Sequence, residues 1–545
     1  MSVDTNNAAF QDALNLIQYT RQSVFLTGKA GTGKSTFLRY VCENTKKKHV
    51  VLAPTGIAAI NAGGSTMHSF FKLPFYPLLP DDPNLSLQRG RIHEFFKYTK
   101  PHRKLLEQIE LVIIDEISMV RADIIDAIDR ILRVYSHNLR EPFGGKQLLL
   151  VGDVFQLEPV VKNDEREILN RFYPTPYFFS ARVFGQIDLV SIELQKVYRQ
   201  TDPVFVGVLD HIRNNTAGAA DLQLLNTRYG SQIEESEADM YITLATRRDT
   251  VDSINEKKLA ELPGDPITFE GVIEGDFPES SLPTSQELVL KPGAQIIFIK
   301  NDFDRRWVNG TIGVIAGIDE EEETIYVITD DGKECDVKRE SWRNIRYRYN
   351  EKTKEIEEEV LGSFTQYPIR LAWAITVHKS QGLTFSRVVI DFTGGVFAGG
   401  QAYVALSRCT SLDGIQLKKP INRADIFVRP EIVNFAGRFN DRQAIDKALK
   451  QAQADVQYAA AARAFDKGDM EECLEQFFRA IHSRYDIEKP VPRRLIRLKL
   501  GIINTLQEQN KKLKEQMREQ QERLRQYAHE YLLMGNECIT QAHDA

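Results

Sequence analysis

The sequence predicts an α/β protein with two doubly wound parallel-sheet segments, an inserted small β-barrel and a C-terminal helical region. Three observations predict this class: a glycine-rich loop between a strand and a helix, apolar strands that end in polar residues, and a later change to short alternating strands and then to helices. Strands alternating with helices form parallel sheets that bind ligands at the strands' carboxyl ends. At 545 residues, three or four domains are expected.

The glycine-rich loop satisfies the P-loop pattern G-x-x-x-x-G-K-[ST]. An apolar strand at 23–27 precedes it and a helical pattern at 37–41 follows, so a chance glycine turn is the weaker interpretation. Backbone N–H groups and the helix N-terminus would hold phosphates, Lys34 would reach the β- and γ-phosphates, and Ser35 would hold Mg²⁺. The predicted nucleotide contacts are Gly28, Ala30, Gly31, Thr32, Gly33, Lys34, Ser35 and Thr36.

Polar residues at the ends of two later strands are the expected partners of this loop. Asp115 and Glu116 follow the apolar run 111–114, and Gln156 follows the run 148–151. Asp115 would hold Mg²⁺, Glu116 would polarise the attacking water, and Gln156 would sense the γ-phosphate. The alternatives are a solvated acidic strand end and an ordinary loop glutamine.

Two later arginines are candidates for charge stabilisation on the γ-phosphoryl group. A guanidinium supplied by a facing domain stabilises the transition state of phosphoryl transfer. Arg199 and Arg408 stand in Tyr-Arg-Gln and Ala-Leu-Ser-Arg contexts. For an isolated arginine a surface salt bridge is the better interpretation, so their assignment depends on the accompanying motifs.

The order of predicted strands and helices along the chain predicts the domain boundaries. The first α/β domain is expected at 1–186, with a proline-rich excursion outside its core at 72–104. The second is expected at 187–286 and 364–436, with parallel strands at 370–374 and 386–391. Short alternating strands and the turn Asp-Asp-Gly predict a small β-barrel inserted at 287–363.

The region 437–545 is predicted to be helical. A helix to Phe465, the turn 467–469 and a helix carrying Phe477 resemble one tetratricopeptide unit, although a single repeat cannot bury its own face. Further on, a stripe with 3–4 spacing contains two polar residues. A coiled coil and an amphipathic helix that packs back on this region are therefore both open. The stripe consists of Leu506, Asn510, Leu513, Met517, Gln520, Leu524 and Tyr527.

Bulk composition excludes some classes of protein. A net charge of −6 and a pI near 6.0 argue against broad polyanion binding but leave room for a locally basic groove. Five scattered cysteines fit reduced thiols rather than a disulfide frame or a zinc site. No run of about eighteen apolar residues predicts a membrane span, and no signal peptide is evident, so a bacterial cytoplasmic location is expected.

Seven motifs in order resemble those of superfamily 1B DNA helicases, over about residues 8–435. The stretch 117–145 resembles the signature of the PIF (petite integration frequency) branch, as opposed to the RecD type. The motifs are Gly28–Thr36, Ala53–Ala59, Asp115–Ser118, Gly152–Leu157, Val197–Gln200, Thr376–Gly382 and Tyr403–Arg408.

This resemblance implies two RecA-like domains with ATP between them, an SH3-like barrel at 287–363 and a strand-separating wedge at 72–104. It places Gln11 at adenine and Gly382 at the nucleotide. Single-stranded DNA would cross the top of the motor, with Phe70 or Phe71 either stacking on bases or lying in the core. The implied DNA contacts are Thr55, Gly56, His68, Ser69, His378 and Lys379, whose alternative roles are helix caps and strand-end turns.

The expected function is an ATP-dependent 5'-to-3' DNA helicase, a monomeric Mg²⁺-dependent motor acting on single-stranded DNA and forks. ATP would draw the domains together through Lys34, Gln156, Arg199 and Arg408, and hydrolysis would let them part. Replication, repair, recombination or telomere-type maintenance are the expected roles. The alternatives are a translocase that does not separate strands, and a scaffold whose tail binds a protein partner.

Overall fold

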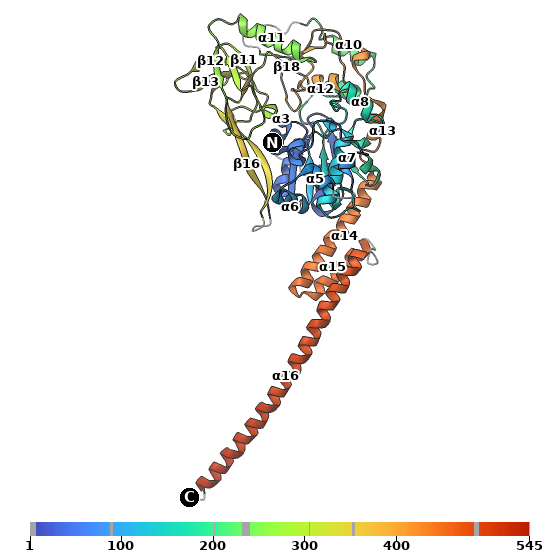
Figure 1. Ribbon diagram of the computed structural model, residues 1–545, viewed down its shortest axis with the longest axis vertical. Coiled ribbons are helices and arrows are strands. Elements are labelled where there is room, and N and C mark those ends of the chain that lie inside the picture. Colours follow the sequence, from blue (N-terminus) through green and yellow to red (C-terminus); the bar gives the residue numbers. More distant parts are fainter. Residues whose placement is uncertain are drawn as a thin grey trace. The chain divides into compact units, whose positions relative to one another are not determined.

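The computed structural model forms two compact units, the first ending at residue 452 and the second beginning at 453 (Figure 1). The structure describes residues 7–87, 91–200, 202–231, 240–304, 306–350, 355–483 and 490–543.

A six-stranded, wholly parallel sheet forms the centre of the first α/β domain. Apart from the two-residue edge strand β3, its strands are largely apolar and buried, as parallel sheets covered by helices require. In spatial order they are β3 (Ser65–Thr66), β2 (His49–Ala53), β4 (Leu111–Ile114), β5 (Gln147–Val151), β1 (Val24–Gly28) and β6 (Val190–Leu194). Because β4, β5 and β1 are neighbours, the loops that follow them meet at one edge of the sheet.

The last strand of this sheet corrects the expected boundary at residue 186. β6 pairs in parallel with β1 from Val24–Val190 to Gly28–Leu194, so the first domain continues at least to Leu194. The sequence of a single apolar strand does not show which sheet it joins, and here only the pairing with β1 assigns β6 to the first sheet.

Helices cover both faces of the first sheet. Val24 and Leu26 face one core with α1 and α2, whereas Phe25 faces the other core with α7, as strand alternation dictates. The helices of this domain are α1 (Ala8–Tyr19), α2 (Lys34–Asn44), α3 (Gly56–Ala62), α4 (Met67–Phe71), α5 (Arg91–Phe96), α6 (Lys100–Gln108), α7 (Ala122–Tyr135) and α8 (Asn163–Leu169).

The segment 72–104 is not an excursion outside the core, and that expectation is wrong. Its apolar side chains are buried in the same cluster as Phe25 and α7; they are Leu73, Leu78, Leu85, Ile92, Phe96 and Tyr98. Most of them come from coil or from very short helices, so their burial has no regular period that sequence analysis can detect.

The second α/β domain has a four-stranded parallel sheet. In order its strands are β18 (Ala374–Thr376), β7 (Ile242–Ala245), β19 (Val388–Asp391) and β20 (Ile415–Leu417). Phe205 of α9 and Val404 of α12 are fully buried in its core. The helices that follow the first sheet are α9 (Pro203–Arg213), α10 (Ala219–Asn226), α11 (Arg248–Glu261), α12 (Gln401–Ser407) and α13 (Pro430–Ala436).

Antiparallel strands form the inserted barrel region, beginning at Ile267 rather than at 287. A five-stranded sheet runs in the order β14 (Glu334–Val337), β13 (Thr324–Thr329), β12 (Ile312–Asp319), β11 (Gln295–Phe298) and β17 (Ile369–Leu371). The remaining strands pair as β15 (Glu340–Asn350), β16 (Glu355–Gln366) and β9 (Val272–Gly275), and as β10 (Glu287–Leu290) with β8 (Ile267–Glu270).

The run expected as one parallel strand at 370–374 in fact serves two sheets. Arg370 and Leu371 pair antiparallel with β11 of the barrel, whereas Ala374 pairs in parallel with Thr243 of β7. Two residues therefore connect the barrel to the second sheet. The long hairpin of β15 and β16 also packs against α6 (Figure 1). On this hairpin, Tyr347 is buried beside Phe70 of α4.

The C-terminal helices are α14 (Arg442–Lys467), α15 (Met470–Ser483) and α16 (Pro490–His543). In the first unit, Ile445 and Ala448 of α14 are buried in the core that contains α1. In the second unit, Tyr458 packs edge-on against Phe477 across the turn at Gly468, with ring centroids 5.9 Å apart. Side chains of α16 are exposed throughout residues 504–543, so the alternative that this helix packs back on its own region is wrong. No helix among the described residues is long and apolar enough to span a membrane.

Candidate active site

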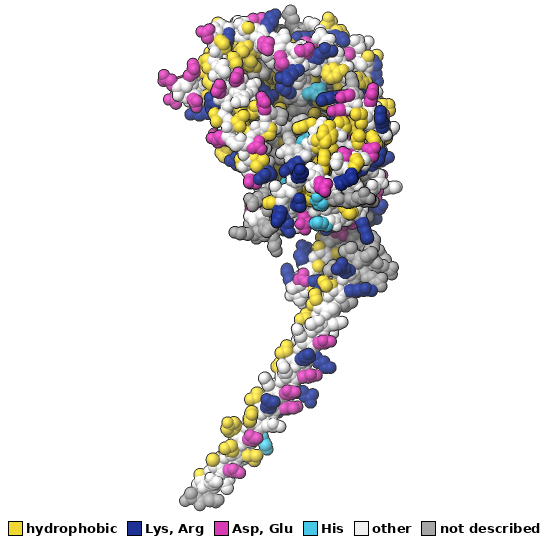
Figure 2. Space-filling view, in the orientation of Figure 1, with side chains coloured by type: hydrophobic (Ala, Val, Ile, Leu, Met, Phe, Trp, Pro, Cys, Tyr) yellow, Lys and Arg dark blue, Asp and Glu magenta, His cyan; other side chains and the backbone are white. Residues whose placement is uncertain are grey.

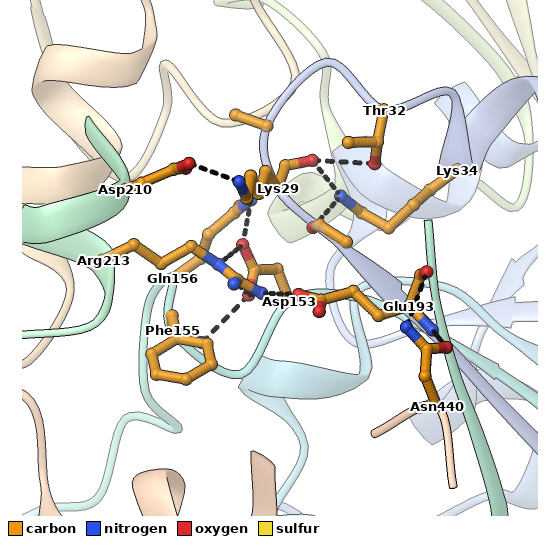
Figure 3. Close-up of polar contacts among 12 residues, drawn as sticks. Lys29, Thr32, Lys34, Asp153, Phe155, Gln156, Glu193, Asp210, Arg213 and Asn440 are labelled. Carbon is orange, nitrogen blue, oxygen red and sulfur yellow. Dashed lines mark hydrogen bonds and ion pairs between the residues drawn. The ribbon is translucent and has the colours of Figure 1, made fainter. Parts of the chain in front are cut away.

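The loop between β1 and α2 has the backbone that a phosphate cradle requires. Gly31 and Gly33 have φ angles of 79° and 88°, which side-chain-bearing residues adopt only with strain. α2 begins at Lys34, so its positive dipole end points into the loop. The Lys34 ammonium donates hydrogen bonds to the carbonyls of Gly28 at 2.7 Å and Lys29 at 2.9 Å (Figure 3).

A cavity of about 490 Å³ opens over this loop, and both α/β domains line it. Its volume lies in the range of small-molecule sites. The predicted residues that line it are Ala30, Gly31, Thr32, Gly33, Lys34, Ser35, Thr36, Asp115, Glu116, Gln156, Arg199, Gly382 and Arg408. Gly28 is not part of the lining, although its carbonyl accepts from Lys34. Gln11 is half-buried on α1 outside the lining, where Asn7 and Phe10 stand instead.

Three cations converge on this cavity, and in the described part of the chain none of them has a carboxylate within ion-pair distance. Lys34 and Arg199 are half-buried and Arg408 is buried, and they donate to backbone carbonyls, apart from one bond to a serine hydroxyl. Burial lowers the pKa of Lys34 and of Arg199, and burial together with the charge of Arg199 lowers the pKa of Arg408 to about 9. Unpaired cations removed from water favour a polyanion.

The acidic pair follows β4 and lines the same cavity as the cations. Burial and the neighbouring Asp115 raise the pKa of Glu116 to about 7, and burial also raises the pKa of Asp115. A carboxylate with its pKa close to neutral suits a general base. The Ser35 hydroxyl and the Asp115 carboxylate are oxygen donors of the kind that Mg²⁺ takes alongside nucleotide phosphates.

Gln381, a residue that sequence analysis did not select, connects the two domains at the acidic pair. Its side-chain amide donates to the Glu116 carboxylate at 2.8 Å and to the Gln156 carbonyl oxygen at 3.4 Å. It lies inside the motif Thr376–Gly382, beside the selected Gly382, so the signal was present. Gln381 orients the candidate base.

Arg213 of α9 forms a second contact between the domains. It is 3% exposed, and it bonds Asp153 at 3.1 Å and Glu193 at 2.9 Å. Figure 3 draws this contact among the three side chains. Its guanidinium also lies over the Phe155 ring, 4.3 Å from the centroid. No motif marks Arg213, because only tertiary packing makes this charge important.

The P-loop itself has two further contacts with the second domain. Lys29 forms an ion pair with Asp210, one turn before the end of α9 (Figure 3). The Ala30 amide donates to the Tyr403 hydroxyl at 3.0 Å. Tyr403 belongs to the motif that ends in Arg408, so one helix, α12, positions both the P-loop contact and the arginine that follows it.

The predicted DNA contacts lie on three elements. The exposed Thr55 hydroxyl caps α3 by accepting from the Ala58 amide at 3.2 Å, which is its alternative role. At Gly56, an added Cβ would lie 2.9 Å from Cα of Ser281, so this glycine permits close packing. Lys379 shares a small cavity with Ile57 of α3, which brings these segments of the two domains together.

His68 and Ser69 lie on α4, and His378 and Lys379 follow β18. Burial lowers the pKa of His68, of His378 and of Lys379. Phe70 and Phe71 are 3% and 0% exposed, so the core interpretation of both is right and base stacking by them is excluded. Phe75, which was not selected, is 82% exposed and stacks on the His68 ring at 5.0 Å.

Comparison with known proteins decides the family. The family model described as PIF1-like helicase matches residues 4–211. The "ATP-dependent DNA helicase Pif1" of Campylobacter jejuni is 33% identical over 412 residues, which cover 72% of this chain and 88% of that protein. The chain belongs to the PIF1-like helicase family. The resemblance of its motifs to the PIF branch is thereby confirmed.

Solved PIF1-like helicases confirm the predicted fold class. The "Crystal structure of Bacteroides sp Pif1 in complex with ADP-AlF4" has a TM-score of 0.73 and 41% identity, covering 80% of this chain and 97% of that one. The "Crystal structure of Bacteroides Pif1 bound to ssDNA" has a TM-score of 0.58 at 41% identity, covering 82% and 99%.

Proposed function

We propose that this PIF1-like helicase is an ATP-hydrolysing DNA helicase that moves 5'-to-3' on single-stranded DNA and separates the duplex ahead of it. The observation that carries the proposal is the convergence of Lys34, Arg199 and Arg408, without carboxylate partners among the described residues, on a P-loop cavity shared by two domains. A triphosphate is the ligand that matches this charge.

Hydrolysis in this site requires positioning more than covalent chemistry. Ser35 and Asp115 would hold Mg²⁺, which supplies charge neutralisation at the phosphates. Glu116, oriented by Gln381, accepts the proton of the attacking water. Lys34 and the two arginines stabilise the charge that develops on the γ-phosphoryl oxygens.

Movement follows from the division of this site between two domains. A γ-phosphate that bonds Lys34 and Gln156 on one side and Arg199 and Arg408 on the other holds the domains closed. Loss of that phosphate removes the shared ligand and lets them separate. Alternating grip on the strand then turns each cycle into a step.

Single-stranded DNA is the proposed track, as in the Bacteroides Pif1 complex with ssDNA. The proposed contacts along it are Thr55, Gly56, His68, Ser69, His378 and Lys379. Contacts to phosphates fix the position of a strand without reading its sequence. The exposed Phe75 ring adds a surface on which a base can stack, and it lies in the 72–104 segment proposed as the wedge.

The wider assignments follow from this activity. Each chain carries a complete ATPase site, because residues of one chain line the whole cavity. Forks in replication, repair, recombination or telomere-type maintenance are the substrates, and the bacterial cytoplasm is the location that fits such a motor. Gly382 belongs to the lining of the nucleotide site, and Gln11, on α1 beside that lining, is the proposed adenine contact. The helices after residue 437 offer a surface to a protein partner.

Unwinding of forked duplexes with single 5' or 3' tails tests the proposal. We expect Mg²⁺- and ATP-dependent strand release from the 5'-tailed fork only. Lys34→Ala should abolish release and DNA-stimulated ATPase, whereas Lys257→Ala, an exposed position on α11, should change neither. ATPase without strand release would identify a translocase, and release by the Lys34 variant would exclude this site.

A further inference from the structure

α16 carries a continuous heptad stripe, here called the seam. Its a positions are Ile503, Asn510, Met517, Leu524, Tyr531 and Cys538. Its d positions are Leu506, Leu513, Gln520, Tyr527, Met534 and Gln541. No Lys, Arg, Asp or Glu occupies the seam, although these residues are frequent at the other positions of the helix. Three large apolar residues between 503 and 541, Leu532, Leu533 and Ile539, lie outside the seam.

The seam is open to water. Leu513 is 55% exposed, Leu524 66% and Tyr531 74%. Figure 2 shows hydrophobic side chains at intervals along one edge of this helix and charged side chains along the opposite edge. An apolar stripe of this length is stabilised only when a partner covers it, because helices owe most of their stability to packing of the apolar face.

The period of the seam limits what that partner can be. A stripe that repeats every 3.5 residues drifts by about 20° per heptad on a straight α-helix, hence by about 100° over five heptads. A flat protein surface therefore cannot cover its full length, whereas a helix with the same repeat covers it by supercoiling. α14 and α15, with 26 and 14 residues, do not match the 54-residue α16.

A second copy of α16 has both the length and the repeat that the seam requires. We propose that two copies of this chain associate through a parallel, in-register, two-stranded coiled coil of α16 over residues 503–541. Covering the apolar seam side chains of both helices removes on the order of 1,000 Å² from water. That area is about the minimum of a specific protein interface.

The polar seam residues determine the number and direction of the strands. In the first heptad, Ile503 at a with Leu506 at d is a pair that favours two strands. Asn510 is the single Asn at an a position, and such a residue sets register and oligomeric state. In a parallel in-register pair, Asn510 and Gln520 each meet their own copies and can exchange hydrogen bonds. In an antiparallel pair an a position meets a d position, so in most registers Asn510 would face an apolar side chain and lose its partner.

Cys538 offers a direct test of this register, because it occupies an a position and is the exposed cysteine among the five. In size-exclusion chromatography with light-scattering detection, we expect the full-length chain to have twice its 62.2 kDa mass. Diamide, which takes up two electrons and two protons as two thiols join, should link the pair through Cys538. Dithiothreitol should reverse the link, and Cys538→Ser should prevent it.

Matched substitutions distinguish the effect of the seam from that of any exposed apolar residue on α16. Leu524→Glu in the seam should give a monomer, whereas Leu533→Glu, an equally apolar change outside it, should leave the dimer intact. DNA-stimulated ATPase should persist in both variants, so loss of the dimer can be observed separately from loss of the motor's activity. A monomeric wild-type chain, a trimer, a dimer that survives Leu524→Glu, or a dimer that forms no link at Cys538 would each overturn it.

Discussion

Replacing Arg213 by methionine should destabilise the motor more than any surface arginine does. Methionine fills a similar volume but leaves Asp153 and Glu193 facing each other without their cation. Burial lowers the pKa of Arg213, but the charges of Asp153 and Glu193 outweigh that effect and hold its pKa above the usual value. The folded state therefore depends on these ion pairs. In the variant, the carboxylates of Asp153 and Glu193 remain as uncompensated buried charge.

The magnitude follows from this burial. The Arg213 side chain is 3% exposed and that of Asp153 0%, at a distance of 3.1 Å. Removing one partner of such a pair costs about 3–5 kcal/mol. For a domain of about 150–250 residues, each kcal/mol lowers the melting temperature by about 2–4 °C, so a fall of roughly 10 °C is expected.

Differential scanning calorimetry of the full chain provides the measurement. Arg248→Met on α11 is the matched control, since this arginine is 82% exposed and its pairing with Asp252 contributes little. The melting temperature of Arg213→Lys should lie between those of the wild type and Arg213→Met. Lysine keeps the charge but loses the planar contact with Phe155 and one of the two ion-pair contacts. If Arg213→Met melted within 2 °C of the wild type, the ion pair would contribute no such energy and the reasoning would fail.

Three further predictions concern the site and its support. Gln381→Ala should lower kcat for ATP hydrolysis about 10- to 100-fold with little change in KM, because the variant loses the hydrogen bond that orients the Glu116 carboxylate. An equal change in KM would contradict a role in orienting the base. Gly31→Ala should abolish binding of a fluorescent ATP analogue while circular dichroism stays unchanged, because the φ of 79° is strained for alanine and its Cβ would lie 2.4 Å from Cβ of Arg199. Burial lowers the pKa of His102 to about 4, so between about pH 4 and 6.5 the unfolded chain binds a proton that the folded chain does not. Stability should therefore decrease as the pH falls through this window, and His102→Gln should reduce the decrease in melting temperature; an unchanged pH dependence would exclude His102 as its source.

The parts of the site that could be predicted are those in which chemistry and local backbone coincide. A strand, a glycine loop and a helix start occupy consecutive residues around Lys34, and Asp115 and Glu116 directly follow an apolar strand. Because parallel strands present their carboxyl ends at one edge, these residues converge without any further information. The seven ordered motifs added the second domain's arginines.

Other residues could not be assigned correctly from sequence, because their roles depend on segments far away in the chain. Phe70 and Phe71 were equally compatible with stacking on bases, and only the packing of α4 buried them. The strand β6 joined the first sheet through its pairing with β1. Arg213 carries no motif, and only the approach of α9 to Asp153 makes it important.

By itself, the sequence determined the P-loop, the acidic pair, the order of the motifs and the heptad stripe, because each is written in neighbouring residues or in a short period. Only the tertiary structure decided that the 72–104 segment is core, that Gln381 and Arg213 join the two domains, and that the seam of α16 faces water. Burial and pairing between distant segments are collective properties of the folded chain, and no local pattern encodes them.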